Sequence, residues 1–180
     1  MNKFDFISVL VSIVFGLGLT HLCGGAFQLA YRRQLGTMSL LLAGFTFVVI
    51  VLNWWMFFAW HARTEWTFEA LLVLVAWALS FYGMAFALFP SGSDNNVDSE
   101  ARYRGFAIAF LVTMALDVVQ TALLGTLFQP WYYLPFIAQY AVCGIVIHRA
   151  TSGRVRSAVA WWMLLSVLVW SLGVRRQLGQ

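Results

Sequence analysis

Six long apolar runs, separated by short polar stretches, account for most of the chain. They cover residues of about 6–29, 38–60, 67–89, 105–128, 131–148 and 157–174. A membrane-spanning helix needs roughly 20 mostly apolar residues, whereas the strands of a membrane barrel alternate in polarity over about 10 residues. The runs are too long and too continuous for such strands. The pattern therefore predicts an all-α, polytopic transmembrane bundle of six helices that forms a single domain over residues 1–180.

Prolines and polar residues mark the breaks between these runs. The stretch 90–104 is the longest predicted loop, and Gln129–Pro130 makes a tight turn before the fifth run. A proline is tolerated best in the first turn of a helix, where its missing N–H costs little. Pro135 therefore indicates that regular helix in the fifth run begins nearer Leu134 than Trp131.

The overall composition excludes the soluble classes of protein. Hydrophobic residues make up 62% of the chain and charged residues 10%, against about 45–50% and about 25% in soluble domains. A water-soluble fold of 180 residues could not bury so much apolar surface. We therefore expect the lipid bilayer to be the main partner of this chain.

The basic residues are divided unequally between the two ends of the predicted bundle. The end that carries both termini has four of them, namely Lys3, Arg63, Arg175 and Arg176. The opposite end has seven, namely Arg32, Arg33, Arg102, Arg104, Arg149, Arg154 and Arg156. The end of a membrane protein that is richer in basic residues faces the cytoplasm, so both termini are expected on the other side. Because the arginines are scattered over short loops, we expect no nucleic-acid partner.

Aromatic residues gather near the predicted ends of the spans. One end has Trp60, Trp66, Trp131, Tyr132 and Tyr133, and the other has Tyr31, Tyr103, Trp161 and Trp162. Aromatic rings with a polar edge favour the interface between membrane and water. These residues are therefore interpreted as an interfacial belt, with a ligand-binding box as the alternative.

Small residues recur every four positions along the first predicted helix. They are Ser8, Ser12, Gly16, Thr20 and Gly24. Small residues repeated at this spacing let a second helix approach closely. The stripe predicts a helix–helix interface, either within the chain or with a second copy or another membrane protein. The alternative is that this face lines a narrow pathway.

Asp117 is the most informative polar residue, because it lies near the centre of the fourth predicted helix. An ionised carboxylate at that depth is costly, so it is normally paired, protonated or exposed to a water-filled cavity. Thr113, Gln120, Thr121 and Gly125 share its helix face and complete a polar stripe. The stripe fits a site that handles protons or cations. A structural carboxyl group that clamps neighbouring helices through hydrogen bonds fits it as well.

Two polar residues on other helices lie at comparable depths. At a rise of about 1.5 Å per residue, Asp117 lies roughly 18 Å, His21 roughly 12 Å and Asn53 roughly 22 Å from the arginine-rich end. We therefore expect the candidates for an ion or proton path to converge, and these are Asp117, His21, Asn53, Gln120 and Thr113. Asp117 and His21 would then form a proton relay. The alternative for His21 is a core histidine bonded to a backbone carbonyl.

The sequence carries no motif of an enzyme. It has no HExxH, no Cys-x-x-Cys and no phosphate-binding glycine loop, and no nucleophile is spaced with a base. The glycines of the first run form a packing pattern and follow no predicted strand. We therefore expect no catalytic residue, no metal site and no cofactor.

The chain resembles known proteins in three segments, namely Phe4–Val9, Gly16–Leu22 and Trp60–Phe68. They resemble a group of small, uncharacterised bacterial inner-membrane proteins with no assigned activity. The resemblance covers most of the chain and implies a multi-pass protein of the bacterial inner membrane. The chain is also faintly similar to bacterial relatives of the lysosomal potassium channel. Because it lacks the Arg and Phe-Ser-Asp signature of their first helix, no residue role is carried over.

Two functions follow from these observations. The first is a small ion or proton channel or transporter with a mid-membrane polar site around Asp117, which predicts that Asp117 faces a hydrated cavity. The second is a non-catalytic structural or accessory membrane subunit that docks through the small-residue face of the first helix. It predicts that the stripe from Ser8 to Gly24 faces outward in the isolated chain.

Overall fold

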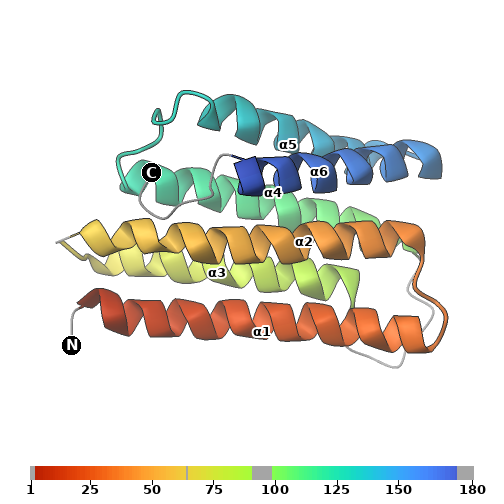
Figure 1. Ribbon diagram of the computed structural model, residues 1–180, viewed down its shortest axis with the longest axis horizontal. Coiled ribbons are helices and arrows are strands. Elements are labelled where there is room, and N and C mark those ends of the chain that lie inside the picture. Colours follow the sequence, from red (N-terminus) through yellow and green to blue (C-terminus); the bar gives the residue numbers. More distant parts are fainter. Residues whose placement is uncertain (1–2, 64, 91–98, 174–180) are drawn as a thin grey trace.

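The computed structural model describes residues 3–63, 65–90 and 99–173 of the protein. Within these residues every regular element is helical, and six α-helices with one short 3-10 helix form a bundle (Figure 1). The elements are α1 (Lys3–Tyr31), α2 (Thr37–Met56), η1 (Phe57–Ala62), α3 (Phe68–Leu88), α4 (Ser99–Leu123), α5 (Tyr133–Arg149) and α6 (Gly153–Gly173). The predicted all-α helical bundle is thus confirmed.

Consecutive helices run in opposite directions along one axis, so α1 begins and α6 ends at the same end of the bundle (Figure 1). We call this the terminal end, and it also holds η1 and the last turn of α4. The opposite end, where α5 finishes at Arg149 and α6 begins, is called the arginine end. Arg175 and Arg176, which the predicted orientation counts, lie outside the described residues.

Five described helical segments are long and apolar enough to cross a membrane, namely α1, α2 with η1, α3, α4 and α6. α5 has 17 residues, which is the lower limit of the usual range of about 17–25. The outer surface is apolar too, since Leu17 on α1, Leu72 on α3 and Val169 on α6 are each more than half exposed. A surface of this kind is unfavourable in water, and it is compatible with an integral membrane protein.

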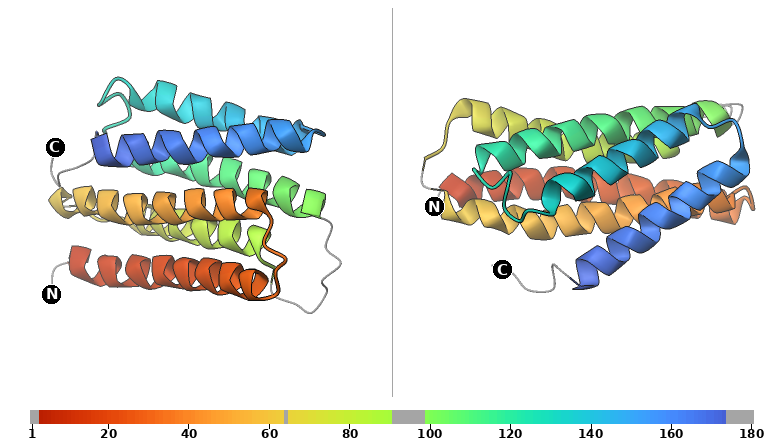
Figure 2. Two further views of the ribbon diagram at one scale, coloured as in Figure 1. Left: turned by 45° about the vertical axis from the view of Figure 1, so that its right-hand side comes forward. Right: turned by 90° about the horizontal axis from the view of Figure 1, so that it is seen from above.

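The helices pack around an aromatic core. α3 packs along both α1 and α4, α2 joins α1 to α6, and α5 lies against α4 and α6 (Figure 2). Phe15 of α1 packs against Trp77 and Phe81 of α3, and the ring centroids lie 5.4–5.5 Å apart. All three side chains are at most 1% exposed. These contacts fix the position of Trp77, whose indole N–H points to the other side of α3.

The fourth helix begins earlier than the hydrophobic run predicts, at Ser99 instead of 105. Its charged first turn is held by side chains, because Glu100 accepts hydrogen bonds from Arg104 at 2.8 Å and from Arg156 at 3.0 Å. Arg156 comes from the first turn of α6 and is only 6% exposed. This arginine therefore joins α6 to α4 within the protein.

The same helix ends earlier than predicted, at Leu123 instead of 128. Gly125 adopts a positive φ of 74°, a conformation that glycine reaches without strain. The N–H of Gly125 bonds to the carbonyl of Ala122, and the N–H of Thr126 bonds to the carbonyl of Thr121. This pair of bonds is the Schellman ending of a helix. This ending turns the chain out of the helix, although the apolar run continues beyond it.

The second predicted helix is interrupted near the terminal end. α2 stops at Met56, and η1 continues as a tighter turn. After this turn, Arg63 donates a hydrogen bond of 2.7 Å to the carbonyl of Leu123, one of the unpaired carbonyls at the end of α4. A cation at that position also interacts favourably with the helix dipole. The connection between α2 and α3 is thereby anchored on α4.

The small-residue stripe of α1 is not the main contact between helices inside this chain. A Cβ atom added at Gly16 or Gly24 would meet no atom within 4 Å, and Thr20 is exposed. Ser8 bonds to the carbonyl of Asp5 in its own helix, and Ser12 accepts a 3.1 Å hydrogen bond from Trp54 of α2. On α1, the close approaches to other helices occur instead at Gly18 and Gly25. The stripe therefore faces largely outward.

Candidate functional site

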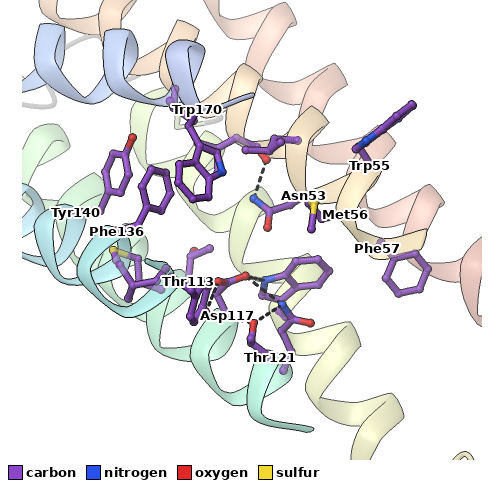
Figure 3. A pocket seen from close by; sticks show the side chains of 18 of the residues that line it. Asn53, Trp55, Met56, Phe57, Thr113, Asp117, Thr121, Phe136, Tyr140 and Trp170 are labelled. Carbon is purple, nitrogen blue, oxygen red and sulfur yellow. Dashed lines mark hydrogen bonds between the residues drawn. The ribbon is translucent and has the colours of Figure 1, made fainter. Parts of the chain in front are cut away.

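A cavity of about 660 Å³ lies between α2, α3, α4, α5 and α6, in the half of the bundle nearer the terminal end. Figure 3 shows side chains from several of these helices around it, with Asp117 and Thr113 on one side and Asn53 and Met56 on another. No residue of α1 is among the described residues that line it. Its size falls within the range of about 300–1,000 Å³ that is usual for small-molecule sites.

Asp117 lies in the wall of this cavity and is half-buried. Its Oδ1 atom accepts hydrogen bonds from the indole N–H of Trp77 at 3.1 Å and from the amide of Gln120 at 3.2 Å. Its Oδ2 atom accepts a hydrogen bond of 2.8 Å from the hydroxyl of Tyr133. The carboxylate thus joins α3, α4 and α5, and all three donors are electrically neutral.

A second group of hydrogen bonds supports this arrangement. The buried indole N–H of Trp60, from η1, donates to Oε1 of Gln120 at 3.0 Å. The amide nitrogen of Gln120 also donates to the Thr121 hydroxyl at 3.1 Å, and the Tyr133 hydroxyl lies 3.1 Å from the same oxygen. A buried network in which each member has a partner is rigid. Asp117 is therefore held in one orientation.

Two other predicted site residues, Thr113 and Asn53, line the cavity but do not join this network. The Thr113 hydroxyl donates to the carbonyl of Ala109 in its own helix at 2.9 Å. The amide nitrogen of Asn53 donates to the carbonyl of Val49 at 2.8 Å, again within one helix. The structure therefore brings Asp117, Gln120, Thr113 and Asn53 to one cavity. Only the first two of these are hydrogen-bonded to each other.

The predicted relay between His21 and Asp117 is wrong. His21 lies on α1, and its Nε2 atom donates a 2.7 Å hydrogen bond to the backbone carbonyl of Phe89. Phe89 follows the last residue of α3, 12 positions from Trp77, or about 18 Å along the helix axis. The alternative of a core histidine bonded to a backbone carbonyl is the one observed.

The depth expected for Asp117 also needs correction. Because α4 ends at Leu123, Asp117 lies six residues, or about 9 Å, from the terminal end of its helix. It was expected near the middle because the hydrophobic run continues to residue 128. The carboxylate therefore lies closer to the terminal end than to the arginine end.

Three hydrogen-bond donors of the network were not predicted as site residues from the sequence, namely Trp60, Trp77 and Tyr133. Trp60 and Tyr133 were interpreted as members of the interfacial belt. Trp60 is only 1% exposed, so its indole lies within the protein and serves the network. Trp131, which is 80% exposed, does fit the belt. The available signal was chemical, since a buried carboxylate requires donors and indole and phenol groups supply them.

The inner end of the cavity is closed by aromatic side chains. Phe45 of α2, Phe110 of α4 and Tyr140 of α5 pack together with ring centroids 5.5–6.4 Å apart. We call these three residues the aromatic floor. Toward the arginine end, fully buried apolar side chains such as Leu42 and Phe106 fill the described interior. The described residues thus form a site that is closed on its inner side.

The cavity offers hydrogen bonds, one carboxylate and many apolar contacts. Among the described residues of the chain, no three His, Cys, Asp or Glu side chains form a group that could hold a metal ion. The described lining residues likewise include neither cysteine nor histidine. This chemistry suits the binding of a molecule through one charge and an apolar wall.

In comparisons with protein-family models, with curated proteins and with solved structures, this chain has no match.

Proposed function

We propose that this chain is a small multi-pass transporter of the bacterial inner membrane, and that the cavity beside Asp117 is its substrate site. The observation that carries this proposal is the rigidly held carboxylate in the wall of a cavity of about 660 Å³. Membrane proteins retain an embedded ionisable group at a cost, and most such groups serve a function. In this proposal the chain has no catalytic role of its own.

The closed inner end favours a transporter over an open channel. A channel needs a continuous polar path, whereas the aromatic floor and the buried apolar side chains beyond it separate the cavity from the arginine end. A transporter exposes its site to one side at a time and needs such a barrier. We place the arginine end in the cytoplasm, so the site is nearer the outer side of the membrane.

The test is transport by proteoliposomes that contain either the wild-type protein or a variant with a filled cavity. Asn53→Trp adds a large side chain where Asn53 lines the cavity and bonds only within its own helix. Val51→Trp is the matched control, because Val51 is 42% exposed on the same helix and does not line the cavity. The probes are small fluorescent or radiolabelled aromatic compounds that are positively charged, neutral or negatively charged.

We expect the wild type and Val51→Trp to transport at least one probe faster than empty liposomes. Asn53→Trp should reduce that rate by about tenfold or more, because its indole occupies the space of the substrate. If no probe moves faster with folded wild-type protein than without protein, the transporter proposal is wrong. Equal rates for the two tryptophan variants would show that this cavity is not the site.

A second function is favoured by a specific observation on α1. Gly16 and Gly24 have open space where other residues would place a side chain, and the stripe from Ser8 to Gly24 faces largely outward. We infer that this face is available to a second copy or to another membrane protein, as an accessory subunit requires. Close approach at small residues supplies the dispersion contacts that hold membrane helices together.

Self-association in nanodiscs or detergent tests this second function. Gly16→Leu combined with Gly24→Leu should convert wild-type oligomers to monomers, because the added side chains keep the helices apart. Gly83→Leu on α3 is the control, since Gly83 also has no atom within 4 Å of the added Cβ position but lies outside the stripe. A wild type that stays monomeric at every concentration, with no effect of either change, would argue against a self-association role.

A further inference from the structure

We propose that the substrate of the Asp117 cavity is a lipophilic organic cation, such as a substituted ammonium ion that carries an aromatic or aliphatic group. This inference rests on the proposed function, since it names the substrate class of the same site. Three observations support it, and they are the charge of the cavity wall, its aromatic composition and its size.

The charge of the wall selects for a positive ligand. Among the described residues that line the cavity, Asp117 carries the only carboxyl group, and neither lysine, arginine nor histidine is present. Trp77, Gln120 and Tyr133 donate hydrogen bonds to its carboxylate. Neutral donors orient a carboxylate without cancelling its charge. A cation in the cavity would supply the missing positive charge, whereas an anion would be repelled.

The aromatic wall offers the second interaction that organic cations need. Twelve of the 28 described lining residues are aromatic, so aromatic side chains form a large part of the wall. Trp170 of α6 stacks on Phe136 of α5 at a centroid distance of 4.0 Å, and Tyr132 meets the same indole at 4.9 Å. Figure 3 shows Trp170, Phe136 and Tyr140 beside the cavity that Asp117 lines. Aromatic faces attract cations, and most strongly where water is excluded.

The size of the cavity separates organic from inorganic cations. A dehydrated metal cation is small and is bound by several oxygen ligands close together, about six to eight for Ca²⁺. This cavity has a volume of about 660 Å³ and presents one carboxylate on a largely apolar wall. An inorganic ion bound there would lack ligands on most sides. A molecule with a charged centre and an apolar body would use both the carboxylate and the wall.

Binding of three matched probes to the purified wild-type protein tests this inference. The probes are benzyltrimethylammonium, its neutral carbon analogue neopentylbenzene and the anion benzylsulfonate. The charge of the ammonium probe does not change with pH, so changes in binding report on the protein. Binding is followed by tryptophan fluorescence and by the shift in thermal unfolding, each in the wild type and in the variants.

We expect the wild type to bind the cation more tightly than the neutral analogue by about tenfold or more, and the anion least. Asp117→Asn should remove this preference for the cation while binding of the neutral probe persists. Trp170→Leu should weaken cation binding several-fold. It should leave the Asp117 network unaltered, because the described donors to that carboxylate are Trp77, Gln120 and Tyr133. Trp162→Leu is the control, since Trp162 is 57% exposed and does not line the cavity.

The outcomes separate this inference from the proposed function. If the neutral analogue binds as tightly as the cation, and Asn53→Trp abolishes both, the cavity is a binding site but the cation inference is wrong. Tighter binding of the anion would overturn the inference in the same way. If no probe binds to the folded wild type, both the inference and the assignment of this cavity as a substrate site fail. Trp170→Leu keeps the inference testable should Asp117→Asn not fold.

Discussion

Replacing Asp117 with alanine is expected to destabilise the folded bundle by about 3 kcal/mol or more, which corresponds to a fall in melting temperature of roughly 6–12 °C. The substitution removes the acceptor of three hydrogen bonds, which come from Trp77, Gln120 and Tyr133. A buried donor left without an acceptor costs about 1–3 kcal/mol. These donors also come from three different helices, so the packing of α3, α4 and α5 should loosen together.

Thermal unfolding in detergent, followed by circular dichroism, measures this effect. Thr113→Val is the matched control, because Thr113 lines the same cavity on the same helix but donates only to its own backbone. Its loss should cost at most about 1 kcal/mol. Equal melting temperatures for Asp117→Ala and Thr113→Val would contradict the clamp that the hydrogen bonds describe.

Asp117→Asn separates the structural role of this residue from its charge. The asparagine carbonyl can accept from Trp77 and Gln120, and its amide can donate to the oxygen of Tyr133. The variant should therefore lose about 1 kcal/mol or less of stability while losing transport and the preference for cations. A clamp and a substrate anchor are thus compatible roles for one carboxylate, because neutral donors can hold it without neutralising it.

The sequence predicts well what depends on local spacing along one helix. Asp117, Gln120 and Thr121 were expected on one face because a helix repeats every 3.6 residues, and the structure links these side chains through hydrogen bonds. The partners Trp77 and Tyr133 come from other helices, and apolar helices give no sign of which neighbour each one meets. An indole group can lie at a membrane interface, and it can equally donate a hydrogen bond to a buried acceptor. The position of Trp60 in the sequence therefore did not identify its role.

His21 shows why matched depth is insufficient evidence for contact. The distance along the membrane normal can be calculated from the sequence, but the rotation of a helix and the choice of its neighbours cannot. α1 packs on α3 and α2, and the cavity lies on the far side of these helices. His21 instead bonds to the carbonyl of Phe89, the residue that follows α3, where backbone carbonyls lack a partner within the helix.

The limits of the fourth helix show what hydropathy measures. The run 105–128 is apolar, but residues after Leu123 leave the helix because Gly125 ends it. The charged residues from Ser99 to Arg104 were assigned to a loop, although Glu100 and Arg104 pair at the spacing of one helical turn. Hydropathy reports where a segment can lie in a membrane, whereas glycine and paired side chains decide where the helix begins and ends.

Gly25→Ala is expected to destabilise the protein by about 1–3 kcal/mol, the usual cost of overpacking a filled core. The added methyl group would overlap the Cβ atom of Phe89 and lie 2.5 Å from its Cγ atom. Phe89 cannot move away easily, because it is 5% exposed and its carbonyl is bonded to His21. The end of α3 and the Nε2 bond of His21 should therefore be disturbed together.

Gly24→Ala is the matched control for this prediction, because it makes the same change one residue earlier in the same helix. The new methyl group would meet no atom within 4 Å, and alanine is favoured over glycine in a helix by about 1 kcal/mol. Gly25→Ala should therefore lower the melting temperature, whereas Gly24→Ala should raise it or leave it unchanged. Equal stability of both variants would mean that α1 and α3 do not approach each other at Gly25.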